Sequence, residues 1–464
     1  MTGWLSTYPG HKFRRQEAGT LMLKESDKID ALVRTAVFGS EDEKAHARWM
    51  IWEMGQKEGV RPASIHDLYM ARGRGDVPPF TTPAMHDRIL SYDTGRALFR
   101  AAKRLDAGAI ICEIARSEIA YTDQRPAEYV AVMTAAALRE GFTGPLFIQG
   151  DHVQVNAKKY AADPDAELKA LRALIEEELH AGFYNVDVDT STLVDLSKPN
   201  LDEQQRTNYE RAAELTTYIR SKEPAGVTVS VGAEIGEVGG KNSDVHELQA
   251  FMEGYTRTLQ RLGTKVGISK ISVQTGTSHG GVVLPDGSIA KVKLDLEALQ
   301  ALSVDARKKY GLGGAVQHGA STLPPEAFSQ FPQCEAVEIH LATNFQTIVM
   351  DHPALPQDLR REVNEWVKLE AKEEWKKGDT EEQFIYKSRK KAIGPFKRRF
   401  WDLPADVRAA IGADLEKTFS FLFEQLRVKG TRAATDKYVK PKLDSHAAPR
   451  AALVSAPDDA EAGE

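Results

Sequence analysis

The chain has few cysteines and no long apolar segment. It contains two cysteines, Cys112 and Cys334, and no CxxC pair, which argues against a disulfide framework. No apolar run approaches the roughly 20 residues that span a bilayer, and the N-terminal segment MTGWLSTYPGHKFRR has no continuous apolar core. We therefore expect neither a membrane anchor nor a secretory signal, and a cytoplasmic enzyme is the default interpretation.

An excess of positive charge is also absent. The net charge of −6 gives no reason to expect nucleic acid as a partner, and we interpret the basic run KSRKKAIGPFKRRF at 387–400 as a solvated helix face. No GxGxxG follows the first strand-like segment, so a dinucleotide-binding domain is not expected.

From about residue 88 to 345, strand-like apolar segments alternate with amphipathic helical segments. The strands are expected at 88–93, 108–114, 145–151, 185–189, 227–235, 268–276, 313–319 and 336–342. Eight such strands over roughly 250 residues predict a (β/α)8 barrel, the TIM barrel, of the α/β class. A doubly wound open sheet is the alternative.

The segments on either side of the predicted barrel have a different character. We expect an N-terminal helical extension at 1–87, the barrel at 88–352 and a C-terminal helical region at 353–442. The Ala/Pro/Asp-rich segment 443–464 is expected to be disordered. The C-terminal helices could cap the barrel or form a subunit interface, and a homo-oligomer (dimer or tetramer) is expected.

Three histidines stand at the ends of predicted strands: His152 in GDH, His279 in GTSHGG and His318 in QHGAST. Asp151 precedes the first histidine, and Glu234 ends the fifth strand. Because the carboxyl ends of barrel strands converge on one face, these groups predict a divalent metal site with an adjacent base. A lone histidine is more often a satisfied polar group, but three at matching strand ends favour the metal.

The motifs GDH, GAEIGEVGG, GTSHGG and QHGAST, in this order and spacing, resemble the class II (zinc-dependent) fructose- and tagatose-bisphosphate aldolase family over roughly residues 88–345. The resemblance implies zinc bound by His152, His279 and His318, with Glu234 as a nearby carboxylate and Asp151 as the catalytic acid/base. It also implies a ketose bisphosphate substrate, most simply fructose 1,6-bisphosphate, and a place in glycolysis. Asp189 matches the family's fourth-strand aspartate.

Substrate and phosphate contacts are expected from the loops after the last strands. The candidates are the amides of Gly280 and Gly319, the Ser321 hydroxyl, and His340, Thr343 and Asn344. Helix capping before PPEAF is the structural alternative for Ser321.

The sequence departs from the family around these positions. In the eighth-strand motif, HLATN has His340 and Asn344 where the family has Asn and Asp. The family's Tyr-Lys pair after the sixth-strand motif is absent. After the fifth-strand GG, KNSD stands in place of the family's acidic pair. An aldolase of altered specificity is therefore an alternative. A second alternative is a non-catalytic barrel, because the segment from GRALFRAAKRLD to GDHV also resembles the accessory subunit of tagatose-bisphosphate aldolase.

Overall fold

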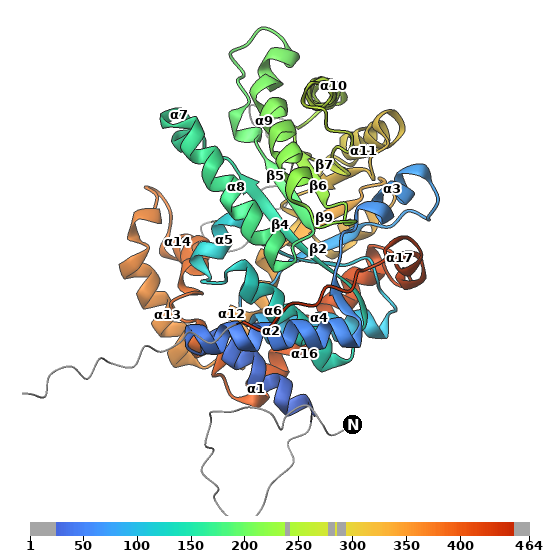
Figure 1. The fold of residues 1–464 in the computed structure, drawn as a ribbon. Helices are drawn as coiled ribbons and strands as arrows, with labels where there is room; N and C mark the ends of the chain where they lie inside the picture. The colour runs from blue at the N-terminus through green and yellow to red at the C-terminus, as the bar shows by residue number, and fades with distance from the viewer. Residues whose placement is uncertain (1–24, 237–241, 277–283, 285–293, 450–464) are drawn as a thin grey trace, which may run out of the picture.

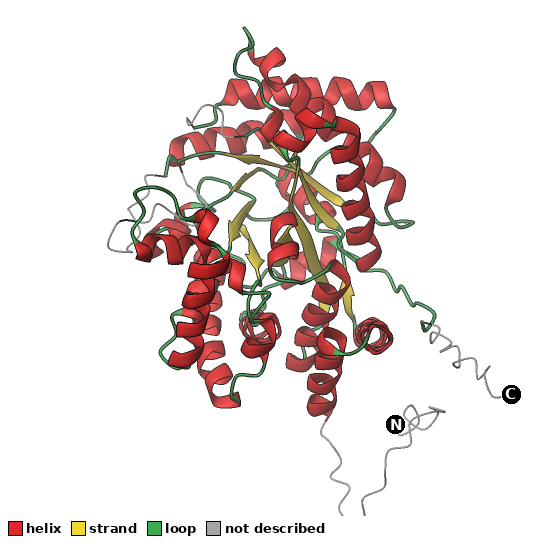
Figure 2. Cartoon of the chain, turned by 90° about the vertical axis from the view of Figure 1, so that its left-hand side faces the viewer, coloured by secondary structure: helices red, strands yellow, loops and turns green. Residues whose placement is uncertain are grey.

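Eight parallel strands close into a barrel at the centre of the molecule, and helices surround it (Figures 1 and 2). The structure is a computed structural model that describes residues 25–236, 242–276, 284 and 294–449. Strand pairing runs β2-β3-β4-β5-β6-β7-β8-β9, and β9 pairs with β2 to complete the circle. The barrel strands are β2 (Thr82–His86), β3 (Ile111–Ala115), β4 (Gly144–Gln154), β5 (Asn185–Asp189), β6 (Ser230–Glu234), β7 (Lys270–Val273), β8 (Ala315–Gln317) and β9 (Glu338–Leu341). The predicted (β/α)8 barrel is confirmed.

The first strand differs from the sequence prediction. Of residues 88–93, expected as a strand, 88–90 precede helix α4 and 91–93 form its first turn. The strand is formed by Thr82–His86, six residues before the expected start. Pro83 explains the error, because a proline inside a short run argues against a central strand. The barrel therefore begins inside the segment assigned to the N-terminal extension.

Helices connect most of the strands and cover the outside of the barrel. Their apolar faces pack on the outward residues of the strands, such as Val186, Val231 and Ile271, which are fully buried. The helices between strands are α4 (Ser91–Arg104), α5 (Arg116–Tyr121), α6 (Pro126–Glu140), α7 (Ala157–Ala162), α8 (Pro164–Ala181), α9 (Leu201–Lys222), α10 (Val245–Leu262) and α11 (Leu296–Tyr310). Between β8 and β9 the chain instead forms two 3₁₀ turns, η2 (Ala320–Thr322) and η3 (Pro325–Gln330).

The N-terminal extension joins the barrel at its amino end. Its elements are α1 (Glu25–Phe38), α2 (Glu41–Glu58), β1 (Val60–Pro62) and α3 (His66–Arg74). Both α1 and α2 pack on α6, and β1 pairs in parallel with the first residues of β4. The extension is therefore continuous with the barrel and adds a ninth strand to the sheet.

The C-terminal region is helical, as predicted. It comprises α12 (Thr343–Met350), α13 (Gln357–Glu370), η4 (Lys372–Glu374), α14 (Glu381–Ser388), η5 (Arg389–Ala392), α15 (Lys397–Trp401), α16 (Ala405–Gln425) and α17 (Arg432–Tyr438). Helix α16 lies along α4 (Figure 1), where Arg100 Nε donates to Glu416 Oε2 at 2.6 Å. Among the described residues, no helix combines the length and apolar character that a membrane span requires.

The predicted disordered tail is ordered at its start. The indole N–H groups of Trp49 and Trp52 donate to the carbonyls of His446 and Asp444, at 2.8 and 2.6 Å, and the His446 ring stacks on Trp52. Two aromatic donors on α2 therefore bind a segment whose composition alone indicated disorder. Residues 450–464 lie outside the described part of the chain.

Candidate active site

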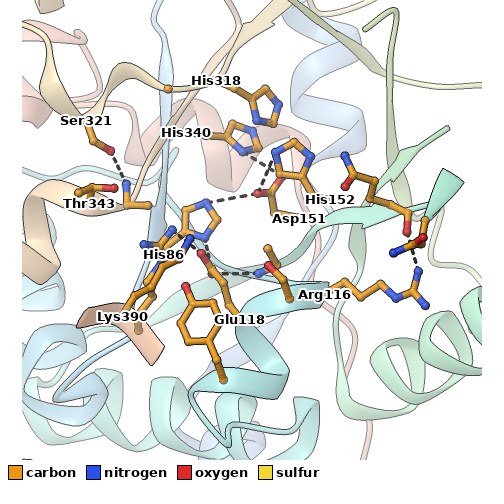
Figure 3. Close-up of a pocket in the computed structure, with 18 of the residues that line it drawn as sticks. His86, Arg116, Glu118, Asp151, His152, His318, Ser321, His340, Thr343 and Lys390 are labelled. Carbon is orange, nitrogen blue, oxygen red and sulfur yellow. Dashed lines mark hydrogen bonds and ion pairs between the residues drawn. The ribbon is translucent and has the colours of Figure 1, made fainter. Parts of the chain in front are cut away.

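A cavity of about 530 Å³ opens at the carboxyl ends of the strands, where four predicted site residues converge (Figure 3). Asp151, His152, His318 and His340 all line it. Gly319, Ser321 and Thr343, from the loops after β8 and β9, line the same cavity. His279 and Gly280 lie outside the described residues.

A β-bulge in β4 brings Asp151 and His152 to this cavity together. Gly150 pairs with Val186 and Val153 with Val188, so β4 has one residue more than β5 between these pairs. His152 takes up the extra length with φ of 42°, in the left-handed region that residues with a side chain rarely adopt. In a regular strand two consecutive side chains would point to opposite faces. The bulge turns both into the barrel mouth.

His152 is surrounded by side chains of the types that bind metal ions. Its Nδ1 lies 3.1 Å from Asp189 Oδ2 and 3.7 Å from Glu234 Oε2, and its ring centroid lies 4.5 Å from that of His318. Ligand atoms of His152, Asp189 and Glu234 lie within 4.8 Å of one another, and so do those of Asp151, His152 and His318. Burial and the neighbouring Asp189 raise the pKa of Glu234 to about 8. The predicted ligands that the structure describes are therefore brought together.

Asp151 stands between two imidazoles on the other side of the same mouth. Its Oδ1 lies 3.2 Å from His340 Nδ1, and its Oδ2 lies 3.4 Å from His86 Nε2. Burial alone would raise the pKa of Asp151, but the imidazoles of His152 and His340 hold it well below its ordinary value. These contacts favour the carboxylate form of Asp151 over the protonated form.

Sequence reasoning missed His86. It ends β2, and its ring is held by Glu113 Oε1 at 2.9 Å from Nε2 and by Glu118 Oε2 at 2.6 Å from Nδ1. Burial lowers the pKa of His86, but these two carboxylates raise it to about 10. The signal was present in the sequence, because His86 is a fourth histidine at a strand end. Placing the first strand at 88–93 left it outside the pattern.

The loop residues predicted to bind phosphate divide between two cavities. Gly319 has φ of 69°, which favours glycine, and Ser321 Oγ accepts a hydrogen bond from the Ala342 amide at 2.6 Å. Ser321 therefore ties the loop after β8 to the end of β9 and does not cap a helix. Thr343 lines the active cavity, whereas Asn344 lines a neighbouring cavity of about 830 Å³ under α16.

Beneath the mouth, the barrel interior contains a buried ion-pair network that sequence reasoning also missed. Lys270 Nζ donates to Asp187 Oδ2 at 2.9 Å, to Gln149 Oε1 at 2.7 Å, and to Glu338. Burial would lower the pKa of Lys270, but Asp187 and Glu338 raise it. A Cβ at Gly232 would lie 2.3 Å from Asp187 Oδ1, so this glycine leaves room for the network.

Comparison with known families identifies the chain. The family described as fructose-bisphosphate aldolase class-II matches residues 84–392, about two thirds of the sequence. The chain belongs to this family. A comparison with curated protein sequences finds no match.

Solved structures share the fold at low sequence identity. A probable tagatose 6 phosphate kinase from Sinorhizobium meliloti 1021 has a TM-score of 0.53 at 17% identity, over 78% of this chain and 95% of that one. The fructuronate-tagaturonate epimerase from Cohnella laeviribosi has a TM-score of 0.51 at 13% identity, over 75% and 83%. A fructose-bisphosphate aldolase from Campylobacter jejuni has a TM-score of 0.47 at 17% identity, over 79% and 94%. For the two structures with TM-scores above 0.5, the likeness at these identities extends to the fold alone.

Proposed function

We propose that this class II aldolase family member is a zinc-dependent lyase that reversibly cleaves a ketose bisphosphate. The proposed substrate is fructose 1,6-bisphosphate, and the products are dihydroxyacetone phosphate and glyceraldehyde 3-phosphate. The observation that carries the proposal is the bulge in β4, which presents a carboxylate and an imidazole side by side at the barrel mouth. A metal-assisted aldol cleavage uses a base and a metal ligand at one reacting centre.

The donor set around His152 fits a divalent transition metal. Imidazole nitrogens and carboxylate oxygens are ligand types that zinc prefers, and the two overlapping clusters of ligand atoms share His152. In the proposed site His152, His279 and His318 hold the ion, and Glu234 is a nearby carboxylate. When bound, the ion supplies a Lewis acid that draws electron density from the ketone of the substrate.

Asp151 is the proposed acid and base. In cleavage its carboxylate takes the proton from the C4 hydroxyl as the C3–C4 bond breaks, and in condensation it returns that proton. His340 and His86 approach its two oxygens, at 3.2 and 3.4 Å, and orient the carboxylate. We propose that Asp189 holds the His152 ring by accepting a hydrogen bond at Nδ1, where the two atoms lie 3.1 Å apart.

The charge of the cavity suits an anionic substrate. Its lining includes Arg88, Arg116, Lys159 and Lys390 against two carboxylates, those of Glu118 and Asp151. We propose that one phosphate binds at the turn after β8, on the Gly319 amide and the Ser321 hydroxyl, with Gly280 and Thr343 beside it. Asn344 lines the neighbouring cavity, so we assign it no contact with this phosphate.

The test combines metal analysis with a substrate panel. The isolated protein is expected to contain stoichiometric zinc and to release trapped triose phosphates from fructose 1,6-bisphosphate, and a chelator is expected to stop the release. Full activity after complete metal removal would contradict the zinc assignment.

A panel of ketose phosphates and keto acids separates the alternative functions. Release of a different aldehyde would identify another ketose as the substrate. Formation of an epimer without cleavage products would identify an epimerase. No turnover alone, together with a co-purifying aldolase subunit, identifies an accessory barrel.

A further inference from the structure

Three consecutive basic residues of the C-terminal region have different surroundings. Arg389 contacts Asp351 with both terminal nitrogens, at 2.5 and 2.9 Å. Lys391 pairs with Glu374 and lies 3.6 Å from Glu373. Each flanking cation is therefore neutralised by an acidic side chain of the same region.

Lys390, between them, extends into the active cavity instead (Figure 3). Its ammonium lies 5.8 Å from the ring centroid of Tyr121, and within the described part of the chain no carboxylate pairs with it. The surrounding protein and the nearby guanidinium of Arg88 lower the pKa of Lys390. A cation exposed to a cavity beside a second cation is an arrangement that an anionic ligand would stabilise.

The segment that carries Lys390 is fixed by contacts that do not involve its side chain. The Gly394 amide donates to the Tyr121 carbonyl at 3.0 Å, and a Cβ at Gly394 would lie 2.6 Å from that oxygen. Lys397 Nζ donates to Glu128 Oε1 at 2.5 Å and also to the Asp123 carbonyl. The C-terminal region is therefore clamped to the segment after β3, and the position of Lys390 is built into the fold.

Arg88 lies at the end of a chain of contacts that starts at Asp151. Asp151 meets His86 at 3.4 Å, His86 meets Glu118 at 2.6 Å, and Glu118 pairs through its other oxygen with Arg88. In Figure 3, His86 stands between Lys390 and Asp151.

We propose that Lys390, with the Arg88–Glu118 ion pair beside it, forms an oxyanion subsite that binds a terminal phosphate or carboxylate of the substrate, separate from the turn at Gly319 and Ser321. The C-terminal helical region thereby completes the substrate site. This inference rests on the proposed function for the identity of the substrate. The anion-binding chemistry itself does not depend on turnover.

Direct binding of inorganic phosphate to the full-length protein tests the subsite. Calorimetric titration is expected to show roughly tenfold weaker binding to Lys390→Ala, the size of effect that losing one charge-assisted contact gives, with most of the affinity kept in Lys390→Arg. Lys391→Ala, whose partners lie outside the cavity, is the matched control and is expected to bind as the wild type does. Equal phosphate affinity in Lys390→Ala and the wild type would overturn the proposal.

Two further arms identify the ligand and separate the two proposals. Titration with glucuronate in place of phosphate shows which oxyanion depends more strongly on Lys390. With fructose 1,6-bisphosphate, Lys390→Ala is expected to raise KM about tenfold and to leave kcat within roughly twofold. Lys390-dependent phosphate binding without any cleavage by the wild type would reject the lyase and keep the subsite. Cleavage by the wild type, with both KM and phosphate affinity unchanged in Lys390→Ala, would keep the lyase and reject the subsite.

Discussion

Strands β4 and β9 both bring ionisable side chains to the barrel interior, but by different means. In β9 the pattern is regular: Glu338 and His340 point inward, two residues apart, and Ile339 and Leu341 are buried on the other face. In β4 the inward residues Asp151 and His152 are consecutive, because the bulge inserts one residue. The regular strand β9 therefore contributes Glu338 and His340 to the floor of the site, whereas the bulge in β4 places Asp151 and His152 together at the proposed reacting centre.

The two strands are expected to respond differently to substitution. Glu338 takes part in the buried network with Lys270, whereas Asp151 faces the cavity and stands close to His152. We therefore expect changes on β4 to reduce turnover with little loss of stability, and changes on β9 to reduce stability first. The predictions below test this difference.

Asp151→Asn is expected to have the largest effect on turnover. The amide has nearly the shape of the carboxylate but cannot accept the hydroxyl proton, and positioned acid–base groups contribute roughly 10²–10⁴-fold. The variant should therefore lose most of kcat while it keeps its zinc and its unfolding midpoint. Steady-state kinetics, metal analysis and urea unfolding check the three expectations. Wild-type kcat in this variant would remove Asp151 from the role of base.

Glu338→Gln is expected to reduce the free energy of unfolding by about 3–5 kcal/mol, because it leaves the buried Lys270 with one anionic partner fewer. Glu335→Gln is the matched control. Glu335 pairs with Arg307 at the surface, where its side chain is 30% exposed, and such pairs contribute about 0–1 kcal/mol. Urea unfolding of both variants measures the difference. Equal stability of the two would show that the interior network does not support the barrel.

Asp189→Asn is expected to weaken zinc binding by roughly 10–100-fold, the usual cost of losing a group that orients a metal-binding histidine. Asp189 lies 3.1 Å from His152 Nδ1, on the side away from Asp151. Asp195→Asn, at an exposed position after the same strand, is the control and should leave the zinc affinity unchanged. Competition with a chromophoric chelator gives both dissociation constants, and unchanged affinity in Asp189→Asn would contradict the role of Asp189 in holding the ring.

Sequence reasoning recovered what periodicity and motif order encode. The apolar segment at 336–342 predicts β9, and the strand-end histidines predict the face where the site lies. The bulge is different, because nothing in GDHV states that His152 adopts a left-handed conformation; that follows from the pairing of β4 with β5. The first strand was misplaced because Pro83 masked it, and with it His86 was missed. Lys390 was assigned to a solvated helix face because its cavity is formed only by tertiary packing.

Ser321→Ala is expected to have the smallest effect, and it distinguishes the loops from the strands that they follow. Removing the hydroxyl deprives the Ala342 amide of its partner at 2.6 Å, and it removes one proposed donor to phosphate. The loop is partly open to the cavity, so water can replace the lost acceptor, and we expect less than the roughly 1–3 kcal/mol that an unsatisfied buried donor costs. KM for fructose 1,6-bisphosphate should rise by less than about tenfold with kcat nearly unchanged. A fall in kcat as large as that of Asp151→Asn would mean that the turn after β8 positions the reacting groups themselves. Turnover would then be as sensitive to substitution in this loop as in β4, contrary to the expected difference.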